Sequence, residues 1–402
     1  MSPLSSVLFV LSLTCGASTF IDNTVPRLDI SGAIMDSHDF SLHKYPNLPG
    51  YYLVSIAYGD CHEPAKQGCD QTPDKCGFQP NHTINVWHSN DLSSGTWTKV
   101  TTAVDLSNRP PGTIFRPDAV WNPNTNEVVL WYNWLNAQGV YEGYAAYTAP
   151  TPAGPYTRMR EAVNVSMQNA TENCGDFHLF IDPANNTPYV IAGCGFHMWI
   201  ERLMPNMLDS AGDTSPTGRH LFDEYFIEAP ALFYRNGVYY AVFASCCCYC
   251  FQGSGAIVHT APHPLGPWTT LGDVACVKAP PSAPALAAPR AAAASSRRAA
   301  FLSAVLGPQA SSSALGATPT PGQGCQHVDP STTSALRSQQ SDIFEVDLAG
   351  GGTAWIWAGD RWQQAPDGLK AHDPQLWVPI EFNADNSIAP LRFLDNFSLP
   401  IV

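Results

Sequence analysis

The segment TAPTPAGPYT, residues 148–157, recurs almost letter for letter as TAPHPLGPWT at residues 260–269. Each copy closes a longer segment that begins with a short alternating strand, residues 144–159 and 256–271. A third segment, residues 84–100, follows the same plan of a strand, a turn and an aromatic residue followed by threonine. Such internal repetition is the sequence signature of an architecture built from copies of one unit.

Short runs rich in aromatic and β-branched residues alternate with these turns, and each is typical of a buried inner strand. The runs are residues 51–58, 128–134, 189–192, 238–244 and 354–358. Because a β-propeller is built by radial repetition of four-stranded units, five runs predict an all-β, five-bladed β-propeller. A β-sandwich is also all-β, but it does not explain why the turn after one strand is copied two units later.

The composition suits many short strands and limits the partners. Charged residues are 13% of the chain and aromatic residues 11%, and there are 35 Pro and 30 Gly for tight turns. A net charge of −14 leaves no basic surface to neutralise nucleic-acid phosphates or to bind an anionic membrane. We therefore expect a protein that binds neither nucleic acid nor membrane, and a neutral, sugar-like ligand instead. We also expect a monomer.

The N-terminal residues predict export. Residues 1–18 hold an apolar run, Val7 to Leu13, and then the small residues Gly16, Ala17 and Ser18, which is the pattern of a cleaved secretory signal. Five Asn-x-Ser/Thr sequons agree with a secreted, extracellular protein: Asn81, Asn164, Asn169, Asn185 and Asn396. We expect a signal peptide at 1–18 and a single propeller domain at 19–402, in preference to a buried N-terminal strand.

The cysteines favour the same compartment. Of the 12 cysteines, Cys15 falls in the signal, which leaves an odd number for the mature chain. Closely spaced Cys61, Cys69 and Cys76 suit a disulfide in a polar loop. Zinc is the alternative for residues 246–250, CCCYC, but adjacent cysteines on a strand point to opposite faces. We favour disulfides of open pairing over a metal site.

Residues 279–323 interrupt the repeat pattern between the fourth and fifth runs. Ala, Pro and Ser dominate this segment, which has almost no aromatic residues. It cannot bury enough apolar surface to offset the entropy of ordering the chain, so we predict a disordered loop without a catalytic role. A translated non-coding segment is the alternative interpretation.

Three acidic residues, Asp39, Asp118 and Glu228, each stand just ahead of an apolar run in a different repeat. Matching places in three repeats would gather them at the mouth of a propeller's central channel. Glycosidic hydrolysis needs one protonated carboxyl and one ionised carboxylate, and a third acid can raise the pKa of the proton donor. Any one of the three alone is a plausible turn or strand-end residue, whereas three together predict a site.

The sequence resembles the glycoside hydrolase family 43 superfamily, whose members are five-bladed propeller enzymes that act on arabinans, xylans and galactans. The resemblance covers most of the mature chain outside the insertion. The matching stretches are His38-Asp39 before Tyr51-Tyr52-Leu53; Arg116-Pro117-Asp118 before Val120-Trp121-Asn122; Gly175-Asp176-Phe177 with Leu179-Phe180-Ile181-Asp182; Glu228-Ala229-Pro230 with Gly237-Val238-Tyr239-Tyr240; and Gly359-Asp360-Arg361-Trp362 with Leu376-Trp377-Val378-Pro379.

The resemblance implies roles for the three acids. Asp39 would be the general base, Asp118 the residue that modulates the pKa of the acid and orients it, and Glu228 the general acid of an inverting enzyme without metal or cofactor. Gln339, preceded by Ser338, and the 359–362 stretch are most similar to the galactan 1,3-β-galactosidase-like subgroup. The chain differs from that subgroup in having Phe115 before Arg-Pro and an aspartate in the first blade.

Substrate contacts are expected from polar and aromatic side chains near these acids. Gln339 and Arg361 can hydrogen-bond sugar hydroxyls, although Arg361 equally suits an ion pair with Asp360. Indole rings can stack on the apolar face of a pyranose, or form blade core; the candidates are Trp121, Trp362, Trp199 and Trp377. Histidines that could line the channel, or serve only structure, are His38, His197 and His372.

These observations predict a secreted, inverting, exo-acting glycosidase that removes galactose or arabinose from a cell-wall polysaccharide or oligosaccharide. A carbohydrate-binding propeller without catalysis is the main alternative. Transfer through a covalent intermediate is a third possibility, which would need a nucleophile, and the separation of the carboxylates distinguishes it from inversion.

Overall fold

The computed structural model describes residues 18–62, 80–167, 174–225, 227–245, 253–275, 277–278, 333–334 and 336–401. The predicted signal peptide, apart from Ser18, and the predicted insertion at 279–323 lie outside these residues. So do Cys69, Cys76 and the cysteines of residues 246–250. No helix in the described part of the chain is long and apolar enough to cross a membrane.

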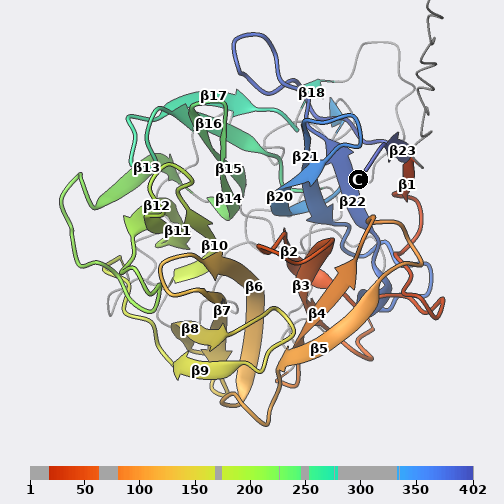
Figure 1. The fold of residues 1–402 in the computed structure, drawn as a ribbon, viewed down its shortest axis with the longest axis horizontal. Coiled ribbons are helices and arrows are strands. Elements are labelled where there is room, and N and C mark those ends of the chain that lie inside the picture. Colours follow the sequence, from red (N-terminus) through yellow and green to blue (C-terminus); the bar gives the residue numbers. More distant parts are fainter. Residues whose placement is uncertain are drawn as a thin grey trace, which may run out of the picture.

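Five antiparallel sheets stand around a common axis (Figure 1). Blade one has β2 (His38–His43), β3 (Tyr51–Ala57), β4 (Thr83–Ser89) and β5 (Thr98–Val104), and blade two has β6 (Gly112–Asn122), β7 (Glu127–Asn136), β8 (Tyr141–Ala149) and β9 (Thr157–Arg160). Blade three has β10 (Cys174–Ile181), β11 (Pro188–Cys194), β12 (His197–Arg202) and β13 (Arg219–Tyr225), and blade four has β14 (Ile227–Arg235), β15 (Val238–Ser245), β16 (Ile257–Ala261) and β17 (Thr269–Asp273). In the part of the chain that the structure describes, blade five has three strands, β20 (Gln339–Asp347), β21 (Thr353–Asp360) and β22 (Gln375–Pro379).

The ring is closed by apolar packing between every pair of neighbouring blades. Each interface has its own buried cluster, and these clusters contain Val54 with Leu130, Trp131 with Leu179, Ile191 with Leu232, Val242 with Ile343, and Leu53 with Phe344. The last cluster joins blade five to blade one. Burial of this kind is the main favourable term in folding, so the five interfaces hold the blades as one body. The predicted five-bladed β-propeller is confirmed.

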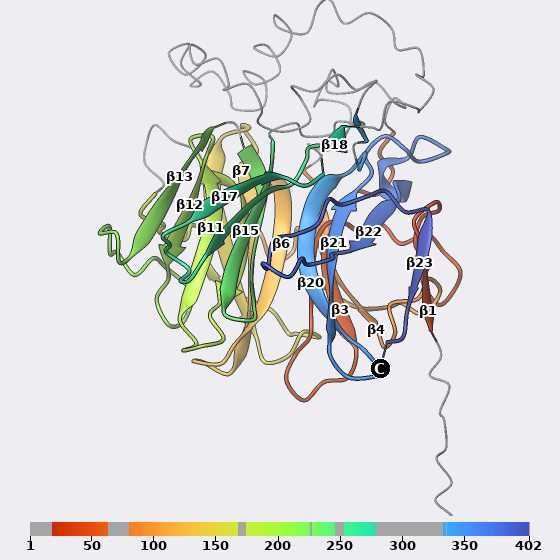
Figure 2. The ribbon, with the colours of Figure 1, turned by 90° about the horizontal axis from the view of Figure 1, so that it is seen from above.

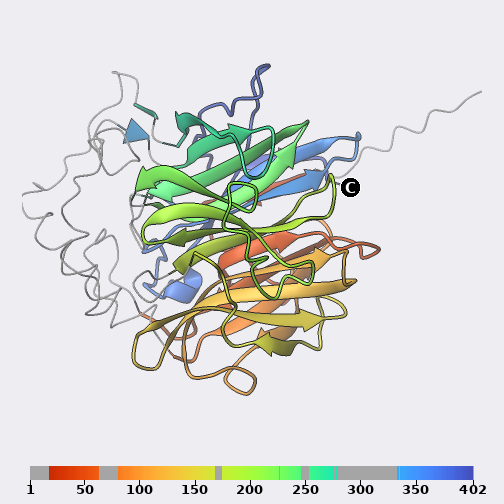
Figure 3. The ribbon, with the colours of Figure 1, turned by 90° about the vertical axis from the view of Figure 1, so that its left-hand side faces the viewer.

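The two ends of the chain reinforce the last interface. Strand β1 (Thr19–Asp22) pairs antiparallel with β23 (Asn396–Leu399), and Figure 2 shows this pair beside β22 and β4. Ile21 and Phe397 pack into the cluster shared by blades five and one. Among the described residues, the remaining short elements are β18 (Val277–Lys278), which pairs with β19 (Thr333–Ser334), and the 3-10 turn η4 (Lys370–His372). Figure 3 shows the blades edge-on.

The repeated TAP motif makes the same turn in two blades. It joins β8 to β9 and β16 to β17, and in both copies the Gly-Pro peptide bond is cis. The glycines have φ of 90° at Gly154 and 96° at Gly266, a region that favours glycine. A Cβ at Gly266 would come within 3.0 Å of the Trp268 ring. The copied sequence therefore encodes a copied backbone.

The five apolar runs are the second strand of each blade: β3, β7, β11, β15 and β21. The strands that line the axis precede them, and the predicted acids lie within these innermost strands rather than ahead of them. The reason is chemical: an axis-lining strand such as β2, HDFSLH, presents polar groups to the channel. Hydrophobic patterning therefore identifies its neighbour more clearly.

Candidate active site

The innermost strands carry a β-bulge near the end of the channel where the predicted acids lie. In β2, β6 and β14 the bulge holds a non-glycine residue with positive φ: 47° at Asp39, 47° at Arg116 and 55° at Ala229. Strand pairing places these three at equivalent positions. Bulges are enriched beside active sites because they redirect side chains, and such backbone conformations persist only where the surrounding structure enforces them.

The same register corrects the expectation that the three acids occupy matching places. Asp39 is at the left-handed bulge position, Glu228 is one residue earlier in its strand, and Asp118 is two residues later. The equivalent of Asp39 in blade two is Arg116. Asp39 and Glu228 therefore reach the site from adjacent bulge positions, whereas Asp118 lies further along β6.

Arg116 is the cation at the centre of the site. Its Nε lies 3.3 Å from Asp176 Oδ2 and 4.0 Å from Asp39 Oδ1, and the side chain is buried. Its terminal nitrogens donate to the carbonyls of Ser341, at 3.2 Å, and Gln340, at 2.6 Å. Burial alone would lower the pKa of Arg116. The attraction of nearby carboxylates outweighs this effect and raises the pKa, and these carboxylates are Asp176, Asp39, Glu228 and Asp360. Arg116 thus links acids from four blades.

Asp39 is buried and held on both sides. Its backbone amide donates to Asp360 Oδ2 at 2.8 Å, which fixes the left-handed residue, and the Tyr58 hydroxyl donates to its Oδ2 at 2.9 Å. Burial raises the pKa of Asp39 to about 6, although the nearby Arg116 cation opposes the shift. A carboxyl with this pKa can accept a proton near neutral pH.

Glu228 is held by two buried side chains. Gln339 Nε2 donates to Glu228 Oε1 at 2.9 Å, and Trp362 Nε1 donates to Gln339 Oε1 at 2.7 Å. An indole can only donate, so its bond fixes which end of the Gln339 amide faces Glu228. Gly359 in β21 permits the close approach of β21 to Gln339 in β20, because a Cβ at Gly359 would lie 2.2 Å from the Gln339 carbonyl oxygen.

The carboxylate of Asp118 has partners of its own, two residues further along β6 than Arg116. Its Oδ1 lies 2.7 Å from His43 Nε2, and its Oδ2 accepts the Leu179 amide at 2.6 Å. Burial alone would raise the pKa of Asp118, but the nearby His178 and His43, with that amide, lower it. Asp118 thus joins blades one, two and three as an ionised group. It lines a small cavity together with Asp39, Phe40, Ser41, Arg116, Pro117, Phe177, His178 and Ser341.

Asp176, to which sequence reasoning gave no role, lies closer to the acids. Besides its contact with Arg116, its Oδ2 accepts the amide of Ala229, the residue after Glu228, at 3.1 Å. The sequence signal that could have identified Asp176 is the Gly175-Asp176-Phe177 stretch, one of the five that carry the family resemblance. The carboxylate next to Glu228 and Arg116 is therefore Asp176, from blade three.

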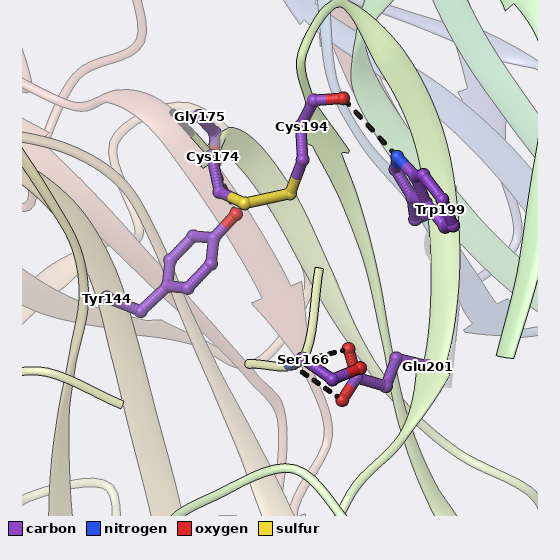
Figure 4. The surroundings of a disulfide bond; sticks show 7 residues. All are labelled: Tyr144, Ser166, Cys174, Gly175, Cys194, Trp199 and Glu201. Atoms are coloured by element: carbon purple, nitrogen blue, oxygen red, sulfur yellow. Dashed lines mark hydrogen bonds between the residues drawn. A yellow bond between two sulfur atoms is a disulfide. The ribbon is translucent and has the colours of Figure 1, made fainter. Parts of the chain in front are cut away.

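A disulfide anchors the strand that carries Asp176. Cys174 and Cys194 are opposite each other on β10 and β11 and are bonded to each other (Figure 4). The Tyr144 hydroxyl donates to the Gly175 carbonyl at 2.9 Å, between the disulfide and Asp176. Both contacts restrain the backbone at the point where Asp176 enters the site.

Residues 75–285, more than half of the chain, match the family model for Glycosyl hydrolases family 43. The chain belongs to glycosyl hydrolase family 43. The resemblance inferred from the five stretches is thereby confirmed. A comparison with curated proteins finds no match.

Solved structures share the propeller. An exo-β-1,3-galactanase from Clostridium thermocellum is 19% identical, with a TM-score of 0.63 over 94% of this chain and 66% of that one. A variant of an exo-β-1,3-galactanase from Phanerochaete chrysosporium, solved with β-1,3-galactotriose, is 16% identical, with a TM-score of 0.61 over 94% and 68%. A family 43 β-1,3-galactosidase solved with galactodeoxynojirimycin is 17% identical, with a TM-score of 0.61 over 93% and 99%. At these identities the likeness shows the fold.

Two of the predicted substrate-binding residues of this family 43 chain lie outside the cluster around Arg116. Trp121 is five residues beyond Arg116 in β6, a distance of roughly 16 Å along a strand, and packs on the cluster between blades one and two. Arg361 donates to Gln364 at 2.9 and 2.7 Å and to the Asn23 carbonyl, and lies 5.0 Å from the Phe393 ring. The structure therefore shows structural contacts for Trp121 and Arg361, and their contact with sugar stays a prediction.

The other two predicted binding residues, Gln339 and Trp362, do reach the site, but they contact Glu228 and each other. Trp377 is buried in the core shared by blades five and one, and Trp199 donates to the Cys194 carbonyl at 3.3 Å (Figure 4). Within the described ranges, no three His, Cys, Asp or Glu side chains form a group that could hold a metal ion.

Proposed function

We propose that this family 43 chain is a secreted, inverting, exo-acting hydrolase that removes terminal galactose from β-1,3-linked galactan. The observation that carries the proposal is the pairing of two carboxyls, the buried Asp39 and the partly buried Glu228, with the shared cation Arg116 on the innermost strands of the propeller. The galactan names of the similar structures support the sugar and linkage.

The proposed chemistry assigns one proton transfer to each carboxyl. Glu228 protonates the glycosidic oxygen as its bond to the anomeric carbon breaks, and Asp39 takes a proton from the water that attacks the opposite face. The water oxygen ends on the anomeric carbon, so the configuration inverts. We propose Asp176, in place of Asp118, as the acid that orients this machinery, because it contacts both Arg116 and the backbone beside Glu228.

Secretion is supported by the surface positions of the sequons. All four sequon asparagines in the described ranges are exposed: Asn81, Asn164, Asn185 and Asn396. The disulfide between Cys174 and Cys194 also suits an oxidising compartment.

The function is tested with β-1,3-galacto-oligosaccharides labelled at the reducing end. The expected result is stepwise release of galactose from the unlabelled end, with α-galactose as the first anomer seen by NMR, because a β-linkage is inverted. Aryl α-arabinofuranosides are the control substrates. Internal cleavage, β-galactose as first product, or equal rates for wild type and Asp39→Asn would contradict the proposal, and the last would favour a binding protein.

The pH dependence follows from Asp39. The proposed base must be ionised and its pKa is raised to about 6, so we expect kcat/KM to rise with pH through this value. Below it, the rate should fall about tenfold per pH unit. Initial rates between pH 4 and 8 measure this acidic limb of the pH–rate profile. A limb at the ordinary aspartate pKa near 4 would show that burial does not raise the pKa of Asp39.

A further inference from the structure

Lys370 is a buried cation beneath the site. It belongs to η4, in the segment between β21 and β22, and its backbone amide donates to the Cys61 carbonyl at 2.8 Å. The residue is 0% exposed. Its Nζ lies 4.3 Å from the centroid of the Tyr58 ring and 4.3 Å from that of the Trp362 ring. A lysine fully buried against two aromatic rings is uncommon, because burying an ammonium is costly.

Each of the two rings is linked by hydrogen bonds to one of the proposed catalytic carboxyls, Tyr58 directly and Trp362 through Gln339. The Tyr58 hydroxyl donates to Asp39 Oδ2, on the side of the base. The Trp362 indole donates to Gln339, whose amide donates to Glu228, on the side of the acid. The same ammonium therefore touches the two chains of hydrogen bonds that hold the base and the acid.

We infer that Lys370 is a positioning residue for the hydrolysis, which fixes Asp39 through Tyr58 and Glu228 through Trp362 and Gln339. The inference rests on the proposed function for the roles of the two carboxyls. A cation over an aromatic face is attracted to the ring, and the attraction is strongest when both are desolvated. The ammonium holds both rings at once and draws electron density from them, which strengthens the O–H and N–H donors at their edges.

The charge of Lys370 also acts on Asp39 directly. The groups that face Asp39 are the cations Arg116 and Lys370, the carboxylates Asp360 and Asp176, the phenol Tyr58 and the neighbouring His38. Burial raises the pKa of Asp39, the two cations lower it, and the two carboxylates raise it further. Removing the Lys370 charge should therefore raise the pKa of Asp39 and weaken the base near neutral pH.

The test compares Lys370→Met, which keeps the length of the side chain without its charge, with Lys370→Arg, which keeps the charge. Lys44→Met is the matched control, because Lys44 also lies over a tyrosine, 5.8 Å from the Tyr51 ring, but pairs with Asp347 of blade five. We expect Lys370→Met to lower kcat about tenfold with KM nearly unchanged and to move the acidic limb to higher pH. Lys370→Arg should restore the limb, and Lys44→Met should leave kcat and the limb unchanged.

A second measurement does not need activity. Because the pKa of Asp39 is higher in the folded than in the unfolded chain, the folded protein keeps this proton longer, and the contribution to stability falls as pH rises from about 4 to about 6. In Lys370→Met this fall should extend to higher pH, which thermal unfolding at a series of pH values detects.

The outcomes separate the two proposals. A wild type inactive on every galactan would overturn the proposed function, and the unfolding series would still decide whether Lys370 acts on Asp39. An active wild type whose Lys370→Met variant keeps both its kcat and its limb would overturn the Lys370 inference alone. A fall in kcat at an unmoved limb, with no rescue by arginine, would reduce Lys370 to core packing and overturn it too.

Discussion

Glu228→Gln is expected to lower kcat on β-1,3-galacto-oligosaccharides by about 10³-fold, within the range for loss of general acid catalysis. The amide oxygen can still accept the hydrogen bond from Gln339, so the geometry of the site is kept while the transferable proton is lost. A leaving group that needs no protonation should escape much of this loss. We therefore expect the rate on 2,4-dinitrophenyl β-galactoside to fall no more than about tenfold, as rates on both substrates would measure.

The control is Glu345→Gln, the same substitution at an exposed position of β20, which should leave both rates unchanged. Equal losses of Glu228→Gln on the two substrates would contradict the acid role, because a residue that only binds sugar does not distinguish leaving groups. A rate unchanged on both would remove Glu228 from the chemistry.

The sequence predicts the fold well because propeller blades repeat local information. The turn around Gly154 has the same backbone as the turn around Gly266, and local sequence encodes both. The second strand of each blade is apolar because it is covered on both sides by neighbouring blades, so runs such as residues 128–134 are visible without any long-range information. The number of these runs equals the number of blades.

The site is less visible in the sequence because bulges decide it. Asp39, Arg116 and Ala229 share one backbone position, but nothing in the residue types of three short stretches shows where a bulge falls. Spacing therefore aligned Asp118 with Asp39, two residues away from the true equivalent. The position of Arg361 was similarly undetermined, since one of the residues that hold it, Asn23, is far away in the chain. Trp121 packs on a cluster to which two blades contribute, so its position also depends on the fold.

Gln339 and Trp362 show a different limit. Sequence reasoning placed both near the acids, which the structure bears out, but expected them to contact sugar. The hydrogen bond from Gln339 to Glu228 joins residues 111 positions apart, and the one from Trp362 to Gln339 joins residues 23 positions apart. A residue type that suits a sugar hydroxyl suits a carboxylate equally well, so the distinction needs the fold.

The second large effect on kcat is expected for substitution of Asp176. Comparison with the same substitution at Asp118 decides which residue is the third acid: Asp176, proposed from the structure, or Asp118, predicted from the sequence. In Asp176→Asn, Arg116 loses its nearer ion pair, 3.3 Å away, and the backbone beside Glu228 loses a charged acceptor. A negative charge near a general acid favours its protonated form, so we expect kcat to fall about 10²-fold. Because Asp176 raises the pKa of Asp39, the acidic limb should also move to lower pH.

Asp118→Asn should lower the stability of the fold and leave kcat nearly unchanged. Its buried carboxylate holds His43 and the Leu179 amide, so the free energy of unfolding should fall by about 2–3 kcal/mol at neutral pH while kcat stays within about threefold. Chemical denaturation and initial rates on the same preparations measure both quantities. A large loss of kcat in Asp118→Asn, with Asp176→Asn unaffected, would restore Asp118 as the modulating acid, because a buried charge that only joins three blades acts on stability and leaves the proton transfers alone.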